Sequence, residues 1–261
     1  MEATLLGQDE PPAFGVAGCG GHSPFVMVCD HAGCRVPRKL GSLGLSAQEL
    51  ASHIAWDIGA GPVAQRLALA LGAFVAWQPY SRLVIDCNRP LTAPDSITAH
   101  SERTFVPGNQ NLKQQEAEAR AQEIFVPYHE QIRAELDRRR DERISTILVS
   151  IHSFTPVFLD VVRPWHIGVL SYRDDRLARP LSHLLREEGD LVVGCNEPYA
   201  ASDVSDFSIV HHGENRGIPV VEIEIRQDLT SDDAGQTAWA DRLARLLVVA
   251  ARPLLSAKHT P

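Results

Sequence analysis

Short apolar runs typical of β-strands alternate with longer amphipathic segments along most of the chain. We expect strands at Phe25–Cys29, Phe74–Trp77, Leu83–Cys87, Ile147–Ile151, His166–Ser171, Leu191–Gly194 and Val220–Ile225. Helices are predicted from Ser46 toward His53, over Ile58–Leu71, within residues 112–142, around Ala178–Glu188 and over Thr237–Ala251. Strands that alternate with helices in this way form a mostly parallel sheet covered on both faces, so the pattern predicts an α/β fold.

Local signals mark where these elements begin and end. Ser46 opens a Ser-x-x-Glu capping box, Gly72 fits a helix C-cap, and Pro127 predicts a kink or break in its helical segment. Residues 90–111 and 196–206 lack periodicity and are predicted loops. Because a long loop inside a compact domain often serves a function, both loops are candidates for the site.

Polar side chains occur where buried strands normally exclude them. His31 follows the first predicted strand closely, and His152 follows the strand that ends at Ile151. The last strand is rich in Val and Ile yet contains Glu222 and Glu224. A buried carboxylate is costly unless it is paired, hydrogen-bonded or bound to a metal. Ligands of open α/β sheets bind beyond the carboxyl ends of the strands, so these residues favour a metal-dependent hydrolase.

A catalytic zinc ion needs three protein ligands and an open position. His31 and His152 are the best two candidates. Asp57 is the third, an acid among apolar residues, although it also fits an N-cap of the helix that follows. Asp30 is an alternative, as a ligand or as an acceptor for a histidine N–H. One Zn²⁺ per chain is expected, and such sites also accept Mn, Co or Fe.

The segment from Ser81 to Pro90 is the candidate substrate-binding region. Arg89 fits a substrate carboxylate through its bidentate fork, with Asn88 as a neutral donor beside it. An alternative is a structural pair of Arg82 with Asp86. In an extended strand these two side chains lie far apart, so each is expected to have a different partner.

Glu224 is the candidate general base, which accepts a proton from water and passes it to the leaving amine. Glu222 has the same strand parity and is its rival. Arg226 is expected to keep one of these acids ionised. A purely structural Glu–Arg pair is the alternative.

Charge, hydropathy and cysteine content limit the kinds of partner and compartment that we expect. The 261 residues carry a net charge of −8, which argues against nucleic acid. No run approaches the ~20 apolar residues that span a bilayer, and the chain opens without a signal-peptide pattern, so a cytoplasmic protein is expected. Five cysteines without regular spacing fit reduced thiols. No repeat or linker divides the chain, so we expect one domain over residues 1–261, with residues 1–22 as a loose arm.

Six segments, in the same order, give the chain a clear likeness to one family. They read Cys-Asp-His-Ala-Gly-Cys-Arg-Val-Pro, His-Ile-Ala-Trp-Asp-Ile-Gly-Ala, Ser-Arg-Leu-Val-Ile-Asp-Cys-Asn-Arg-Pro, Ile-His-Ser-Phe-Thr-Pro, Asn-Glu-Pro-Tyr and Glu-Ile-Arg-Gln-Asp. From about Val26 to Leu247 the chain resembles the N-formylglutamate amidohydrolase family. This family is related in fold to the zinc carboxypeptidases and aspartoacylases. The resemblance implies a three-layer α/β/α sandwich around a mixed, mostly parallel sheet.

The resemblance also implies roles for individual residues. His31 and His152 correspond to metal ligands, Asn88 and Arg89 to the pair that binds the substrate carboxylate, and Glu224 to the general base. The chain departs from the His-x-x-Glu pattern of these relatives, because Cys34 stands where the acid is expected. Either Cys34 is a thiolate ligand or Asp57 supplies the third ligand, and Asp57 is favoured.

The late loop adds two substrate-binding candidates. Tyr199 fits a tyrosine that closes over the substrate in the carboxypeptidases, and His212 is another polar group expected near the site. Arg82 is expected to stabilise the developing oxyanion. The predicted function is zinc-dependent hydrolysis of the amide of an N-acyl amino acid such as N-formylglutamate. Alternatives are a metallocarboxypeptidase acting on short or cell-wall peptides, and a non-catalytic protein that binds a small anion.

Overall fold

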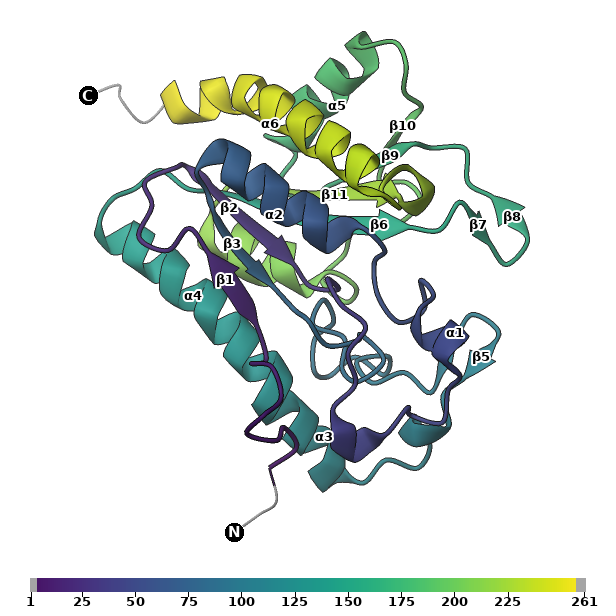
Figure 1. Cartoon of the computed structure of the whole chain (residues 1–261). Coiled ribbons are helices and arrows are strands. Elements are labelled where there is room, and N and C mark those ends of the chain that lie inside the picture. The colour runs from purple at the N-terminus through teal and green to yellow at the C-terminus, as the bar shows by residue number, and fades with distance from the viewer. Residues whose placement is uncertain (1–3, 257–261) are drawn as a thin grey trace.

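The computed structural model describes residues 4–256, and a seven-stranded mixed sheet lies at its centre (Figure 1). In spatial order the strands are β1 (Gly15–Ala17), β3 (Phe74–Trp77), β2 (Phe25–Cys29), β6 (Ile147–Phe154), β11 (Val220–Arg226), β9 (Ile167–Leu170) and β10 (Val193–Cys195). The four strands β3, β2, β6 and β11 are parallel to one another. β1 runs antiparallel to β3, and β9 runs antiparallel to β11. The predicted α/β class with a mixed, mostly parallel sheet is confirmed.

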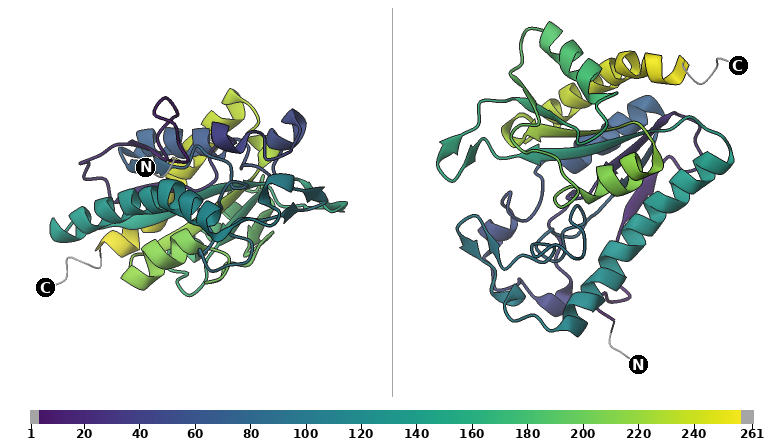
Figure 2. Two further views of the ribbon diagram at one scale, coloured as in Figure 1. Left: turned by 90° about the horizontal axis from the view of Figure 1, so that it is seen from below. Right: turned by 180° about the vertical axis from the view of Figure 1, so that it is seen from behind.

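Helices cover both faces of this sheet. The α-helices are α1 (Ala47–Leu50), α2 (Ala60–Leu71), α3 (Gln114–Arg120), α4 (Val126–Asp141), α5 (Ala178–Glu187) and α6 (Asp233–Ser256). Helices α2, α5 and α6 lie on one face (Figure 1). Seen from behind, α4 and the π-helical turn η4 (Ser208–Gly213) lie on the other face (Figure 2). The architecture is therefore a three-layer α/β/α sandwich.

Shorter elements complete the described chain. Two hairpins, β4 (His100–Ser101) with β5 (Thr104–Phe105) and β7 (Val157–Phe158) with β8 (Val161–Val162), lie outside the main sheet. The short 3₁₀ turns are Arg38–Leu40, Pro107–Asn109, Glu214–Arg216 and Gln227–Leu229. Within residues 4–256, no helix combines the length and apolar character needed to span a membrane.

Several predicted helix ends are confirmed by the local geometry. Ser46 caps α1 through a complete capping box with Glu49, although α1 ends at Leu50, short of His53. Gly72 ends α2 in the left-handed conformation, with φ of 58°. Between α3 and α4 the helix adopts a π-helical turn over Ala121–Phe125, and Pro127 lies in the first turn of α4. The predicted break is therefore a change of helix type at this point.

The predicted strand Leu83–Cys87 is not formed. The Ser81 hydroxyl accepts a hydrogen bond from the Leu83 amide and donates one to a backbone carbonyl, so the chain turns at once. In this turn Arg82 Nη2 lies 2.6 Å from Asp86 Oδ2. The expectation that these two residues have different partners is therefore wrong, because it assumed an extended backbone.

Part of the expected N-terminal arm is attached to the sheet. Strand β1 pairs with β3, and the Tyr80 hydroxyl donates a hydrogen bond of 2.7 Å to the Pro11 carbonyl. Leu5 is buried. Residues 1–3 of the arm lie outside the described part of the chain.

The two faces of the sheet carry different side chains. On β11, Val221, Ile223 and Ile225 pack into the apolar cluster beneath α2, α5 and α6. The alternate residues, among them Glu222 and Glu224, point to the face covered by α4 and η4. One face is thus mainly apolar, while the other carries buried carboxylates and histidine.

Candidate active site

Strand register brings the predicted acid and histidine together. Strands β6 and β11 are parallel, and their pairing sets Glu224 beside His152 and Glu222 beside Ser150. Because side chains alternate across a sheet, all four project from the same face. Strand β2 pairs with the other edge of β6, so His31, just beyond β2, arrives at the same end of the sheet. The prediction that separate strand ends meet in space is confirmed.

Asp57 reaches the same point from the loop before α2. Its backbone N–H donates to the His31 carbonyl at 2.9 Å, which fixes the loop against β2. The N-cap of α2 is Gly59 rather than Asp57, and Gly59 has φ of 81°. A Cβ atom at Gly59 would lie 2.2 Å from the Thr230 carbonyl oxygen, so only glycine fits there. The Asp57 carboxylate is thereby free to face the histidines.

His31, Asp57 and His152 form a compact cluster of metal-ligating groups. One ligand atom from each lies within 4.8 Å of the others, and all three residues are buried. Asp57 Oδ2 lies 2.8 Å from His152 Nδ1 and 3.4 Å from His31 Nδ1. Two imidazoles and one carboxylate are a common donor set of catalytic zinc sites.

The Nε2 atoms of both histidines, which point away from Asp57, already have hydrogen-bond partners. His31 Nε2 lies 2.7 Å from Asp86 Oδ1. His152 Nε2 lies 3.0 Å from Ser150 Oγ and 3.4 Å from Asp30 Oδ2. Carboxylates only accept hydrogen bonds, so the Nε2 proton of each histidine points at its acidic neighbour, and each Nδ1 faces Asp57 as a donor when it is protonated or as a metal ligand when it is not. Asp57 thus needs a positive charge beside it, which protonated imidazoles or a bound cation supply, and the three residues fit a divalent metal ion.

The electrostatics of the cluster favour a positive charge. Burial alone raises the pKa of Asp57, but the adjacent imidazoles outweigh it and hold that pKa well below its usual value. Burial lowers the pKa of both histidines, yet the surrounding carboxylates, with Glu222 the strongest for His152, raise both above normal. The site therefore stabilises a cation, whether a proton or a metal.

Glu222 and Glu224 differ in how they are held. The Asn88 amide donates a hydrogen bond of 3.3 Å to Glu222 Oε2. Glu224 Oε2 is buried and has no hydrogen-bond partner among the described residues. Burial raises the pKa of Glu224 to about 7, while Glu222 is raised well above its normal value by burial and by Asp206. Glu224 is thus the acid that is free to exchange a proton near neutral pH.

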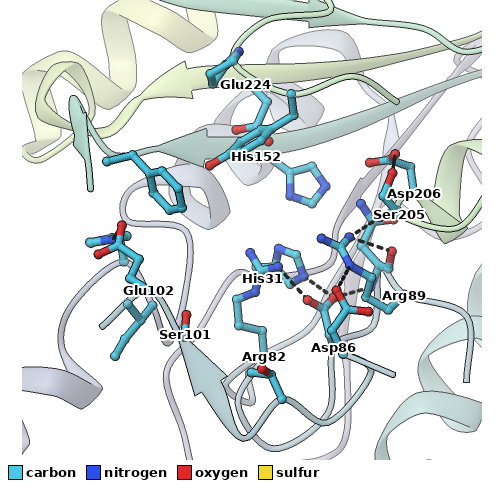
Figure 3. A pocket seen from close by; sticks show the side chains of 18 of the residues that line it. His31, Arg82, Asp86, Arg89, Ser101, Glu102, His152, Ser205, Asp206 and Glu224 are labelled. Atoms are coloured by element: carbon cyan, nitrogen blue, oxygen red, sulfur yellow. Dashed lines mark hydrogen bonds and ion pairs between the residues drawn. The ribbon is translucent and has the colours of Figure 1, made fainter. Parts of the chain in front are cut away.

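These groups open into a cavity of about 590 Å³ (Figure 3). Of the residues predicted from the sequence, those that line it are His31, Arg82, Asn88, Arg89, His152, Tyr199, Glu222 and Glu224. Asp57 lies behind His31 and Arg82, whose Nη1 is 3.7 Å from Asp57 Oδ1. The cavity walls also include the β4–β5 hairpin and Phe158 of β7.

Arg89 and Tyr199 are anchored at the cavity wall. Arg89 Nε lies 3.0 Å from Asp95 Oδ2, and an Arg89 guanidinium N–H donates to the Ser205 carbonyl. The Tyr199 hydroxyl accepts a hydrogen bond of 2.9 Å from Arg163. Both side chains are therefore placed to contact a molecule in the cavity.

Three other residues named by the sequence lie elsewhere. His212 does not line the cavity, and its Nε2 lies 2.9 Å from His129 Nδ1 beneath α4. Arg226 pairs with Asp228 at 2.8 Å rather than with a buried glutamate. Cys34 is half-buried against the apolar cluster and is not a member of the metal-ligating group.

Two supporting contacts were not predicted from the sequence. Asp86 had been weighed only as a partner for arginine, and Ser150 had no assigned role. Ser150 and His152 are two residues apart on β6, the spacing that puts strand side chains on one face. That spacing is a weak signal, whereas the contact between Asp86 and His31 depends on a turn that the sequence did not reveal.

Comparisons with known proteins identify the family and the fold. The family model for N-formylglutamate amidohydrolase matches residues 23–231. An N-formylglutamate deformylase of Pseudomonas putida is 26% identical over 255 residues, which cover 91% of this chain and 92% of the relative. A gene product of Agrobacterium tumefaciens has a solved structure that is 36% identical, with a TM-score of 0.92 over 96% of this chain and 99% of that one. An N-formylglutamate amidohydrolase of Ralstonia eutropha is 18% identical and shares the fold, with a TM-score of 0.69 over 94% of this chain and 98% of that one.

Fold, buried polar site and sequence matches together define an amidohydrolase, an enzyme that hydrolyses an amide bond. The chain belongs to the N-formylglutamate amidohydrolase family, whose model covers most of its length.

Proposed function

We propose that this enzyme is a zinc-dependent hydrolase of N-acyl amino acids, with N-formylglutamate as the first substrate to test. The observation that carries the proposal is the convergence of His31 Nδ1, His152 Nδ1 and the Asp57 carboxylate on one point beside Glu224. The choice of N-formylglutamate comes from a relative, which is an N-formylglutamate deformylase.

His31, Asp57 and His152 would hold the metal, and Asp86 and Ser150 would orient the two imidazoles. A bound zinc ion would supply Lewis-acid polarisation of the acyl carbonyl and of the attacking water. The protein would contribute a buried, preorganised site in which these charges act strongly.

Glu224 would act as the general base. Its free Oε2 would accept a proton from the attacking water and return it to the nitrogen of the leaving amine. The pKa of about 7 lets the side chain do both near neutral pH. A protein that only binds a small anion has no need of such an unpartnered buried acid, which favours catalysis.

Arginines would handle the substrate's negative charge. Arg89, with Asn88, would bind the carboxylate of the amino acid, after exchange or sharing of its contact with Asp95. Arg82 also lines the cavity and would stabilise the oxyanion that develops on the carbonyl oxygen. Tyr199 would close against the bound substrate.

The test combines metal content with turnover. Purified protein is assayed by mass spectrometry for bound metal and with N-formyl-L-glutamate, N-acetyl-L-glutamate and a carboxypeptidase dipeptide. We expect about one zinc ion per chain, release of the free amino acid, and loss of turnover after chelation that zinc restores. Turnover that survives complete removal of metal would contradict the proposal.

A further inference from the structure

The cavity is unexpectedly acidic for an enzyme of an anionic substrate. Its lining includes two arginines, Arg82 and Arg89. Six carboxylic acids line it as well, namely Asp86, Asp95, Glu102, Asp206, Glu222 and Glu224. Each arginine already has a carboxylate partner, at 2.6 Å for Arg82 and 3.0 Å for Arg89. Arg89 can therefore bind one substrate carboxylate only by giving up or sharing its contact with Asp95. Among the lining residues, no second arginine is free of a carboxylate partner.

Glu102 stands apart from the other acids. It lies at the turn of the β4–β5 hairpin, and Figure 3 shows it on the opposite side of His31 and His152 from Arg89. Its Oε1 lies 3.0 Å from His53 Nε2, and the two side chains are 19% and 27% exposed. Glu102 also has a φ of 50°, which is rare for a residue with a side chain. The hairpin thus holds this carboxylate at the cavity wall.

Apolar side chains line the same cavity as this acid. Ile54, next to His53, and Phe158 of β7 both line the cavity. The ion pair of Arg103 with Asp160 joins the hairpin that carries Glu102 to the one that carries Phe158. An apolar wall that ends in a carboxylate complements a short hydrocarbon chain that ends in an amine.

We propose that Glu102, supported by His53, binds a cationic amine on the acyl group, so that the preferred substrate is an N-acyl amino acid with an amine-bearing acyl chain. This rests on the proposed function, in which Arg89 holds the carboxylate of the amino acid and the acyl group points away from it. A cavity of about 590 Å³ lies in the range that encloses small organic ligands, so an acyl group larger than formyl has room. Hydrolysis would add one water across the amide and release the amino acid and an amino-carboxylic acid.

The experiment compares four derivatives of L-glutamate that differ only in the acyl group: formyl, butanoyl, 4-aminobutanoyl and succinyl. Butanoyl and 4-aminobutanoyl differ by the amine alone. We expect kcat/KM for 4-aminobutanoyl to exceed that for butanoyl by about tenfold or more, because a charge-assisted hydrogen bond is gained. Glu102→Gln should remove most of this ratio and leave butanoyl within about twofold. Asp95→Asn, on the Arg89 side of the cavity, is the matched control and should leave the ratio unchanged.

Equal rates for butanoyl and 4-aminobutanoyl, or an equal loss for both in Glu102→Gln, would overturn the proposal. A preference for succinyl would overturn it too, and would point to the buried Arg163 behind Tyr199 as an anion receptor. If no derivative is hydrolysed, the proposed function fails. Calorimetric binding of the same four compounds to Glu224→Gln then decides separately whether Glu102 selects the amine.

Discussion

The two faces of the central sheet bury opposite kinds of side chain from the same strands. Beneath α2, α5 and α6, β11 presents Val221, Ile223 and Ile225, which are completely buried among apolar neighbours. On the other face the same strand presents Glu222 and Glu224, also buried. Burial of the apolar set stabilises the fold, whereas burial of the acids opposes it.

Most polar groups on this face are tied into a hydrogen-bond network. Asp30 accepts a hydrogen bond of 2.7 Å from Ser208, and Asp86 contacts both His31 and Arg82. Among the described residues of this face, Tyr128 Oη, His212 Nδ1 and Glu224 Oε2 have no hydrogen-bond partner, and Glu224 is the one carboxylate of these three. An unpartnered buried acid beside a cluster of metal-ligating residues indicates a site of chemistry rather than a source of stability.

The sharpest way to test this contrast is Glu224→Gln. The change keeps the shape of the side chain but removes the proposed base, so kcat should fall by about 10²–10⁴-fold. The free energy of unfolding should stay the same or rise, since a buried ionisable group is replaced by a neutral one. Steady-state kinetics and thermal unfolding measure the two effects.

Glu222→Gln is the matched control on the same face. Glu222 is held by Asn88, so this variant should keep most of its turnover. An equal loss of kcat in both variants would assign the base to the pair rather than to Glu224.

On the apolar face, Ile223→Ala should have the opposite effect, with lower stability and a retained kcat. It leaves a cavity in a fully buried cluster, so the free energy of unfolding should fall by about 2–5 kcal/mol. The folded enzyme should retain its kcat within a few-fold, because the side chain faces away from the site. Denaturant unfolding checks the first effect, with the 85% exposed Leu69→Ala as a control expected to change stability by less than about 0.5 kcal/mol. A loss of kcat as large as that of Glu224→Gln would show that the two faces are not independent.

Arg89→Gln should weaken binding at the polar face without touching the base. A charge-assisted hydrogen bond to the substrate carboxylate is worth about 1.5–3 kcal/mol, so KM should rise roughly 10- to 100-fold. The value of kcat should change less than KM. An unchanged KM would show that the carboxylate is held elsewhere.

The polar face should also lose stability first in acid. Burial lowers the pKa of His129 to about 4, from the ordinary 6.5 of an unfolded chain. Between these values only the unfolded chain gains the proton, so stability present above pH 6.5 is lost as the pH falls toward 4. The loss by pH 5 should be about 1–2 kcal/mol. His129→Asn should flatten the slope of unfolding free energy against pH, while the exposed His183→Asn should not.

The sequence is sufficient for the central strands but not for β1, the two short hairpins or the turns between elements. Strands β2, β3, β6 and β11 are predicted because each is a short run rich in apolar residues, and His31 and His152 are placed by the ends of β2 and β6. Leu83–Cys87 has the same apolar character, yet Ser81 turns the chain there. Apolar composition alone does not distinguish a buried turn from a buried strand.

The contacts that organise the site join residues distant in sequence. Asp86 is 55 residues from His31, and Ser208 is 178 residues from Asp30. A single sequence carries no signal for such pairs, because any buried acid has many potential partners. In the sequence, Asp57 is favoured over Cys34 because it is an acid among apolar residues in a segment that resembles the family. The geometry supports this preference, since Asp57 lies with His31 and His152.

Anomalous diffraction at the zinc edge, from crystals grown with equimolar zinc, tests the central claim most directly. The account predicts one strong peak within bonding distance of His31 Nδ1, His152 Nδ1 and a carboxylate oxygen of Asp57. A peak bound through Cys34 without Asp57, or no peak at this cluster, would contradict it.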